Sequence, residues 1–324
     1  MIILYGNDNY RIDVTDLVRE KFTDSQDKIC IPTNDHMRAK MFSDPCFGET
    51  KFVKIFDDSL NSRIYPSHEY VHIDWDCNLK NEPAFKNTNQ IKEELANIVK
   101  DHKLVHNHKW SERWVSGHDI NITDSKEHLG GESYEQMMTL RFLSKDAKVL
   151  ELGGNIGRNS MLIGTLLNNK EHHVVLETSP DIANCLKRNR DENNMKFHVE
   201  DAALSKRRLV QKRESWQTVS TDDNVEDTFV VRNITLPELQ NKYGIQFDTL
   251  IADCEGGLFH LLQDDPSVLD NIKMIIVEND YFDQSKQEFV ENLYIQKGFK
   301  KVYTENHPQV QMRHDMFFFE VWVR

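Results

Sequence analysis

The stretch KVLELGGNIGRNS, from Lys148 to Ser160, decides the fold of this chain. Val149–Leu152 is a short apolar run typical of a buried strand, and a glycine-rich turn follows it directly. Apolar residues at helical spacing then begin at Met161. This order opens a nucleotide-binding α/β sheet, because glycine lets the backbone approach a ligand and the helix N-terminus offers unpaired N–H donors.

The spacing of the glycines distinguishes this turn from two known phosphate-binding motifs. A dinucleotide fingerprint, G-x-G-x-x-G, needs a glycine where this chain has Asn155. A phosphate loop ends in Gly-Lys-Ser/Thr, but Arg158-Asn159-Ser160 stands here. What remains is E-x-G-x-x-x-G, with Glu151 near the end of the strand, which favours a positively charged ligand over a pyrophosphate. A purely structural glycine turn in another α/β protein is the alternative.

Composition narrows the class of protein. At 324 residues the chain has the length of two domains, and its 29% charged and 39% hydrophobic residues are ordinary for a globular protein. A net charge of −13 argues against nucleic acid as a partner. The five cysteines form no C-x-x-C pair, and no apolar run reaches the length of a signal peptide or membrane span. We therefore expect a soluble, cytoplasmic protein with reduced thiols and no membrane partner.

Residues 1–88 are predicted to form a small, mainly β domain, because short apolar runs alternate there with Asn, Asp, Gly and Pro clusters. Its role is open: it would bind the acceptor, hold a homodimer together or contact a larger substrate. The predicted strands are Ile2–Tyr5, Ile29–Ile31, Phe52–Phe56 and Tyr70–Ile73, and the predicted helices are Asp13–Phe22 and Asp35–Met41.

Two groups of histidines elsewhere in the sequence are candidate metal ligands. His68 lies near His72, Asp74 and Asp76, but the last three alternate along one predicted strand, which equally describes its solvated face. His102, His106 and His108 lie in a predicted helical linker over 89–130, after an amphipathic helix from Thr88 to His102. In both groups we favour solvated side chains.

From 131 to 324, strands and helices alternate, which predicts a doubly wound α/β domain with its ligand crevice at the carboxyl ends of the strands. The further predicted strands are His173–Leu176, Lys196–Val199, Phe247–Ala252 and Met274–Val277; the helices are Tyr134–Phe142, Pro180–Asn189, Leu236–Tyr243 and Gln284–Gln296; an inserted hairpin or lid lies within Ser205–Val231, and Phe299–Tyr303 with Met316–Val323 forms a closing antiparallel hairpin.

Acidic or amide side chains follow every predicted parallel strand, which makes the crevice acidic. Glu177 lies about twenty residues past the glycine turn, where a ribose diol is held in such sheets. Asp201, after the third strand, is suited to accept a hydrogen bond from an adenine amino group. A cation that carries ribose and adenine fits this crevice, and S-adenosylmethionine is such a molecule. The strand-end residues are Glu151, Glu177, Asp201, Asp253, Glu278, Asn279 and Asp280.

Four motifs in combination resemble the FkbM family of class I S-adenosylmethionine-dependent O-methyltransferases: ELGGNIGRNS, ETSP from Glu177, DAALS from Asp201 and DCEGG from Asp253. The resemblance covers about 131–324 and leaves the N-terminal domain out. It implies a Rossmann-like, seven-stranded sheet with an antiparallel last strand. It also implies methyl transfer to a hydroxyl group, which we expect to belong to a sugar or glycan.

The resemblance also implies roles for individual residues in binding the cofactor. The methionine part would face Glu151 and the turn, the ribose would bind Glu177, the adenine would lie against Asp201 and Ala202, and Asp253 would stand beside the reacting centre. The residues of the turn are Gly153, Gly154, Asn155 and Gly157.

A sugar hydroxyl is a weak acid, so its methylation needs a base or a metal ion. Asp253, Glu255 and Glu278 are the catalytic candidates, with His260 and His314 as further bases. In a second version of the mechanism, Mg²⁺ is held by Asp253, Glu278 and Asn279 and orients the acceptor.

Two other functions compete with methyl transfer. One is a non-catalytic binding or scaffold protein that keeps a methyltransferase fold. The other is a nicotinamide-dependent oxidoreductase, which Asn155 and the acidic crevice disfavour.

Overall fold

The structure, a computed structural model, describes residues 1–24, 27–80, 88–102, 133–212, 218–220, 228–281, 283–305 and 318–324. Contacts between Cα atoms divide the chain into two compact units: Met1–Lys86 with Tyr294–Arg324, and Asn87–Leu293. The boundaries expected from the sequence, 1–88, 89–130 and 131–324, remain predictions. None of the helices in the described part is long and apolar enough to cross a lipid bilayer.

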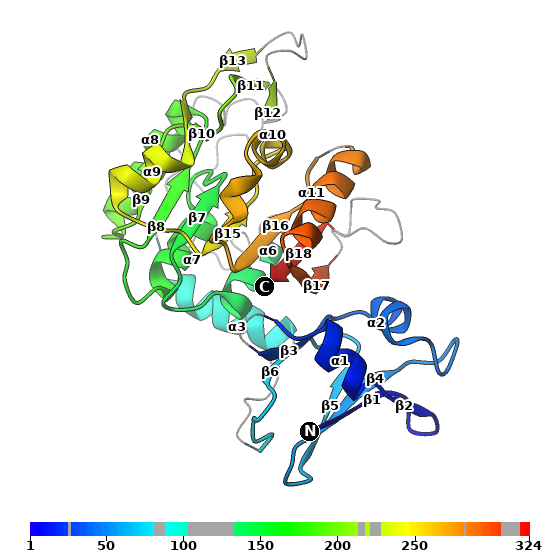
Figure 1. Cartoon of the computed structure of the whole chain (residues 1–324). Helices are drawn as coiled ribbons and strands as arrows, with labels where there is room; N and C mark the ends of the chain where they lie inside the picture. Colours follow the sequence, from blue (N-terminus) through cyan, green and yellow to red (C-terminus); the bar gives the residue numbers. More distant parts are fainter. Residues whose placement is uncertain are drawn as a thin grey trace. The chain divides into compact units, whose positions relative to one another are not determined.

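A seven-stranded sheet forms the centre of the fold, in the order β17-β18-β16-β15-β7-β8-β9 (Figure 1). Its five strands from β16 to β9 run parallel, and β17 pairs antiparallel with β18. The predicted Rossmann-like sheet with a closing antiparallel hairpin is therefore confirmed. The strands are β7 (Val149–Leu152), β8 (His173–Leu176), β9 (His198–Glu200), β15 (Thr249–Ala252), β16 (Met274–Glu278), β17 (Lys300–Glu305) and β18 (Phe319–Val323).

Helices follow the parallel strands and bury their apolar faces against the sheet. Every residue of β7, β8 and β15 is buried, as expected for parallel strands covered on both faces. Leu186 of α8 packs with Val175 of β8 and Val199 of β9 in one cluster. The helices are α3 (Thr88–Val99), α6 (Ser133–Phe142), α7 (Arg158–Leu166), α8 (Pro180–Glu192), α9 (Leu236–Tyr243), α10 (Gly257–Asp264) and α11 (Gln284–Gln296), with a 3₁₀ turn at Pro266–Leu269.

One linker histidine departs from its expectation. His102 was expected to be solvated, but it is buried, and its Nε2 lies 3.1 Å from the hydroxyl oxygen of Thr165. Burial lowers the pKa of this imidazole, so the neutral ring is favoured in the core. His106 and His108 lie outside the described residues.

The insert after β9 is larger than the predicted hairpin. Its strands β11 (Leu209–Lys212), β12 (Thr218–Ser220) and β13 (Thr228–Val230) form a three-stranded sheet in which both outer strands run antiparallel to β11. Two short strands, β10 (Ala203–Leu204) and β14 (Asn233–Ile234), pair in parallel at its base. Leu209 and Gln211 of β11 line the cavity described below.

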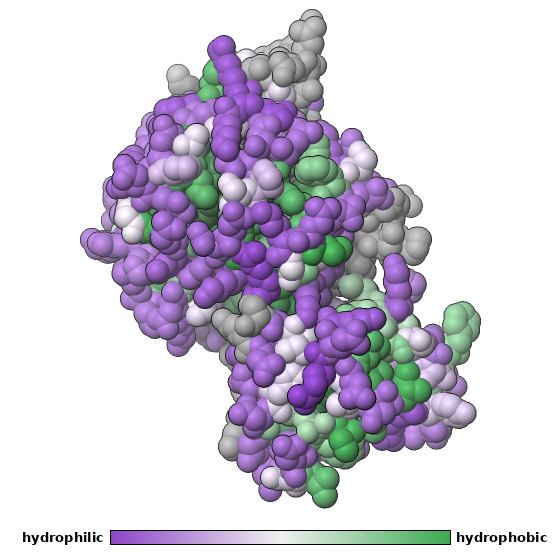
Figure 2. Space-filling model, in the orientation of Figure 1, coloured by the Kyte–Doolittle hydropathy of each residue, from purple (hydrophilic) through white to green (hydrophobic). Residues whose placement is uncertain are grey.

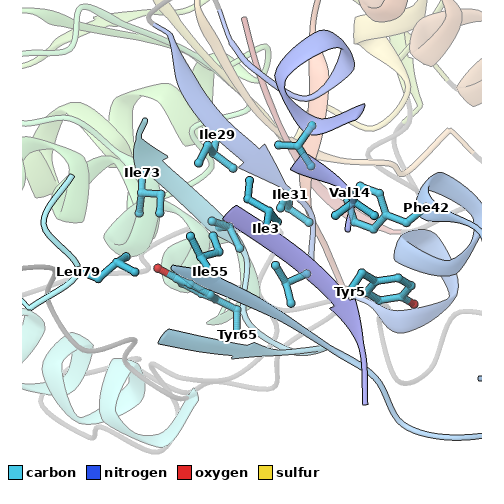
Figure 3. Close-up of a cluster of buried hydrophobic side chains, with 13 residues drawn as sticks. Ile3, Tyr5, Val14, Ile29, Ile31, Phe42, Ile55, Tyr65, Ile73 and Leu79 are labelled. Atoms are coloured by element: carbon cyan, nitrogen blue, oxygen red, sulfur yellow. The ribbon is translucent and has the colours of Figure 1, made fainter. Parts of the chain in front are cut away.

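The first 86 residues supply most of a small β unit, as predicted. Ile3, Ile31 and Ile55 lie in its buried core, which Figure 3 shows as sticks. Its visible surface includes hydrophobic patches, whereas the visible surface of the larger unit is mainly hydrophilic (Figure 2). The four-stranded sheet is β2-β1-β4-β5, made of β1 (Ile2–Gly6), β2 (Arg11–Asp13), β4 (Phe52–Phe56) and β5 (Ser62–Pro66); β3 (Lys28–Ile31) pairs with β6 (Val71–Asp74), and the helices are α1 (Thr15–Lys21) and α2 (Asp35–Phe42).

Strand β17 belongs to this smaller unit by its contacts. The backbone N–H of Thr304 donates a hydrogen bond to the hydroxyl oxygen of Thr33 at 3.4 Å. The ammonium group of Lys300 donates to the carbonyl oxygen of Thr23. The unit is therefore assembled from two segments that are far apart in sequence.

Candidate functional site

A cavity of about 310 Å³ lies at the carboxyl ends of the central parallel strands. Its volume is at the lower end of the usual range for small-molecule sites. The position is the one predicted for the ligand crevice. Residues at the strand ends that line it are Leu152, Gly153 and Asn155 after β7, Leu176, Glu177 and Thr178 after β8, Asp253, Cys254 and Glu255 after β15, and Glu278 of β16.

The glycine turn is shaped by the protein's own packing as much as by the cavity. Gly153 lines the cavity with φ of +88°, and a Cβ there would lie 1.5 Å from the carbonyl oxygen of Asp253. A Cβ on Gly154 would lie 2.3 Å from a methyl group of Val175, and one on Gly157 would lie 2.7 Å from Leu186. The sequence interpretation assigned these glycines to the approach of a ligand. At Gly154 and Gly157, the close neighbours are side chains of β8 and α8.

Glu177 lies at the end of β8 and joins two loops around the cavity. Its carboxylate accepts a hydrogen bond from the N–H of Asn155 at 2.9 Å and another from the N–H of Ser179 at 2.8 Å. Burial raises the pKa of Glu177, and these backbone donors offset part of that effect. The result is a fixed, buried acceptor on the cavity wall, at the position predicted for ribose binding.

The acidic residues after β15 and β16 form a group of neighbouring carboxyl groups. Asp280 accepts hydrogen bonds from the N–H groups of Glu255 and Gly256 and is also hydrogen-bonded to Asp253. Burial raises the pKa of Asp280 to about 6. Burial, with the nearby charge of Asp280, raises the pKa of Glu255 to about 8. Glu255 is therefore a cavity carboxyl group that exchanges its proton near pH 8.

The backbone of Glu255 is held in an uncommon conformation. Its φ is +49°, which is unfavourable for a residue with a side chain. The hydrogen bonds from the N–H groups of Glu255 and Gly256 to Asp280 hold the loop in this shape. Such strain of about 1–3 kcal/mol is common at functional sites, where it aims a side chain.

Several predicted site residues do not reach the cavity in the described part of the chain. The Glu151 carboxylate is buried and lies 2.7 Å from Nε2 of His173. Asp201 forms ion pairs with Arg232 at 2.9 Å and Lys187 at 3.9 Å, although the adjacent Ala202 lines the cavity. These acids therefore have protein partners of their own. Gly154, Gly157 and Asn279 also lie outside the lining; His260 is buried in α10, and His314 falls outside the described residues.

The predicted magnesium ligands are only partly brought together. Asp253 and Glu278 line the cavity, whereas Asn279 is buried outside its described lining. The Asp253 carboxyl group is already hydrogen-bonded to Asp280. Two of the three predicted ligands therefore line the cavity, and Mg²⁺ binding stays a prediction.

Some lining residues had not been predicted. Leu209 and Gln211 come from β11 of the insert, and their sequence carries no signal of a site. Ile182 lies in the first turn of α8, and Leu261 lies in α10, which was not predicted although its segment GLFHLLQD is apolar. Thr178 directly follows Glu177, so its position was available from the strand-end rule.

Similarity to known proteins is found among solved structures. Neither a family model nor a curated protein matches the chain. Among solved structures, it is similar to a ribosomal protein L11 methylase from Lactobacillus delbrueckii subsp. bulgaricus, with 13% identity, a TM-score of 0.36 and coverage of 59% of this chain and 77% of that one. It is also similar to an O-methyltransferase from Bacillus cereus in complex with SAH, with 14% identity, a TM-score of 0.35 and coverage of 76% and 95%.

A third similar structure is a precorrin-6y C5,15-methyltransferase from Geobacter metallireducens GS-15, with 12% identity, a TM-score of 0.35 and coverage of 59% of this chain and 83% of that one. Likenesses of this size do not assign an activity. The chain's own strand order and pairing define a Rossmann-like α/β fold. Its own cavity lies at the carboxyl ends of the strands.

Proposed function

We propose that the chain is an S-adenosylmethionine-dependent O-methyltransferase that methylates a hydroxyl group of a sugar or glycan. The observation that carries the proposal is the cavity itself. It combines a glycine turn after β7, a fixed carboxylate after β8 and a carboxyl group with a pKa of about 8 after β15. The choice of oxygen as acceptor, and of a sugar, comes from the resemblance to the FkbM family.

The cavity residues fit the parts of this cofactor. Glu177 is a buried acceptor, which suits the two ribose hydroxyls as donors. Ile182, Ala202 and Leu209 give an apolar wall that suits an adenine ring. Asp253 and Glu278 add negative charge, which suits the ammonium and sulfonium groups. When bound, S-adenosylmethionine supplies a methyl group already activated by its sulfonium.

Glu255 is the group that we assign to proton removal. General bases work best when their pKa lies near the operating pH, and the pKa of Glu255 is about 8. The Glu255 carboxylate accepts the proton of the acceptor hydroxyl as that oxygen forms its bond to the methyl carbon. Asp280 contacts the backbone of this loop and acts by holding Glu255 in position.

The cofactor is tested by calorimetric titration with S-adenosylmethionine and with S-adenosylhomocysteine. We expect Glu177→Gln to weaken binding about 10- to 100-fold, because its new amide N–H would face backbone donors and one charged acceptor is lost. The matched control is Asp201→Asn, which changes an acid outside the cavity lining and should alter affinity less than about threefold. A wild-type protein that binds neither molecule would refute the cofactor assignment.

The acceptor is tested with radiolabelled S-adenosylmethionine and a panel of sugars, oligosaccharides, RNA and protein. Label that enters a sugar as a base-stable ether supports the proposal, whereas label confined to RNA or protein overturns the acceptor class. Cofactor binding without transfer to any acceptor favours the non-catalytic binding protein. Turnover that survives a chelator supports Glu255 as base, and turnover lost to a chelator and restored by Mg²⁺ supports the metal version.

A further inference from the structure

The two-stranded sheet of β3 and β6 has two unlike faces. One face packs into the hydrophobic core, and the other carries a thiol and an imidazole. Ile29 and Ile31 lie in the buried hydrophobic core of the smaller unit. Cys30 points to the opposite face, because side chains alternate along a strand. In the antiparallel register, Cys30 stands directly across from His72. A thiol and an imidazole are therefore neighbours on one face of the sheet.

Asp24 completes this group from the segment before β3. Its Oδ1 accepts a hydrogen bond from the N–H of Lys28 at 2.9 Å, which fixes the carboxylate beside the sheet. Its Oδ2 lies 3.0 Å from Nε2 of His72 and 3.6 Å from Sγ of Cys30. The three ligand atoms all lie within 4.8 Å of one another.

The two separations from the Asp24 carboxylate match those of donors around one tetrahedral zinc ion. Bonds of about 2.0 Å to oxygen and nitrogen and about 2.3 Å to sulfur place the donor atoms about 3.3–3.5 Å apart in a tetrahedron. The carboxylate–imidazole and carboxylate–thiol distances of 3.0 and 3.6 Å lie close to these values. An ion would contact the three side chains after only small side-chain shifts.

We propose that Asp24, Cys30 and His72 form a Zn²⁺ site, with a fourth position open to water or to an exogenous ligand. Sulfur, nitrogen and oxygen donors are the set that zinc takes in proteins. The Cys30 and Asp24 side chains are almost fully buried, whereas His72 is 24% exposed, so the ion would enter on the histidine side. The site is independent of the proposed methyl transfer.

Charge at the site is consistent with a divalent cation. On binding, the S–H bond of Cys30 breaks, its proton leaves to solvent and a Zn–S bond forms, so thiolate and carboxylate balance the ion. Lys300 is the nearby cation, and it interacts with Cys30 and Asp24. Its ammonium group donates a hydrogen bond to the carbonyl oxygen of Thr23.

The experiment uses the untagged full chain, stripped with a chelator and titrated with Co²⁺ and then Zn²⁺. We expect a thiolate-to-cobalt charge-transfer band with the visible bands of four-coordinate Co²⁺, both displaced by Zn²⁺. Cys30→Ser should abolish the charge-transfer band, and His72→Gln should weaken metal binding at least about tenfold. Cys46→Ser and His36→Gln, a thiol and an imidazole of the same unit outside the cluster, serve as controls and should behave as wild type.

A second measurement covers the case in which Cys30→Ser does not fold. Zn²⁺ should raise the thermal unfolding midpoint of the wild-type chain, Mg²⁺ should not, and His72→Gln should lose the effect. The proposal is overturned if wild type shows neither cobalt–thiolate absorption nor stabilisation by Zn²⁺. It is also overturned if His72→Gln keeps both, because the cluster is then only a carboxylate hydrogen-bonded to an imidazole and a thiol.

Discussion

Glu177 and Glu255 are carboxyl groups on one cavity, but their surroundings give them different chemistry. Backbone N–H groups stabilise the ionised form of Glu177 and offset part of the cost of burial. At Glu255, burial and the charge of Asp280 both favour the protonated form. Carboxyl groups in such different surroundings commonly divide binding and proton transfer between them. This difference is the reason for assigning ribose to Glu177 and the acceptor proton to Glu255.

We predict that Glu255→Gln lowers turnover at least about 100-fold while leaving cofactor affinity within about threefold. In the wild type, the rate should rise as pH increases through about 8, because the Glu255 carboxylate is the active form. Initial rates from pH 6 to 9 provide the check. A variant that retains the wild-type rate would remove Glu255 from the mechanism.

Glu255→Gln, which should lower turnover, should raise the stability of the folded chain at high pH. The pKa of Glu255 is raised in the folded state from 4.5 to about 8, so the folded chain holds the proton more tightly. This contribution to the free energy of unfolding is present below about pH 4.5 and is lost as pH rises to about 8. Glu255→Gln should therefore be more stable than wild type at pH 9, as measured by urea unfolding, with a smaller difference at pH 5. An equal difference at both pH values would contradict the raised pKa.

Among the elements, the turn between β7 and α7 is fitted to the end of β15. Gly153 approaches the Asp253 carbonyl so closely that backbone, rather than a flexible side chain, would have to move for a Cβ. The turn thus sets the spacing of two strand ends that both line the cavity. Position 153 therefore requires glycine because of this backbone contact, whether or not a cofactor is bound.

We predict that Gly153→Ala destabilises the protein by about 3–5 kcal/mol, the range of a severe steric and backbone defect. Gly244→Ala is the matched control: it also has positive φ, at +67°, but nothing lies within 4 Å of its added Cβ. It should cost only about 1–2 kcal/mol, the ordinary penalty of a left-handed conformation. Urea unfolding followed by circular dichroism compares the two. Equal losses would mean that the contact with Asp253 imposes no constraint.

The elements that could be predicted are those whose buried residues form apolar runs in the sequence. Strands β7, β8, β15 and β16 are apolar runs, and acids at their ends correctly indicated the positions of Glu177, Asp253 and Glu278 on the cavity. Strands β2 and β5 were missed, because they are short or partly exposed and carry polar residues. Helix α10 was missed despite its apolar face.

Side-chain direction could not be predicted in the same way. Glu151 reaches a histidine that lies 22 residues away on the neighbouring strand, so its sequence neighbours give no sign of that pairing. Asp201 likewise bonds to Arg232, which belongs to the end of the insert. The group of Asp24, Cys30 and His72 joins residues up to 48 positions apart. Local patterns indicate that an acid follows a strand, but not which partner it faces.

On the scale of the whole molecule, the two proposed ligands belong to different compact units. The cavity is lined by residues of Asn87–Leu293, whereas the zinc ligands belong to Met1–Lys86. Each ligand should stabilise the segments that it contacts. We therefore expect the two ligands to protect different backbone segments from local unfolding.

We predict that S-adenosylhomocysteine slows amide hydrogen exchange around 153–157, 177–180 and 253–257, whereas Zn²⁺ slows exchange around 24–31 and 71–74. Mass spectrometry of peptides from the full chain measures both patterns. Glu177→Gln should lose the first pattern and keep the second, and His72→Gln should do the reverse. Protection that appears in the same peptides with either ligand would argue against two sites.

The smaller unit contains β17, although all of Asn87–Leu293 lies between its two segments in sequence. A ribosome makes the chain from its N-terminus, so the whole larger unit is synthesised before Thr33 and Thr23 can meet Thr304 and Lys300. The nascent smaller unit therefore remains incomplete, with surfaces awaiting β17, while the larger unit is being made. Thr23 and Thr33 thus precede the larger unit in the chain but gain these partners only after it has been made.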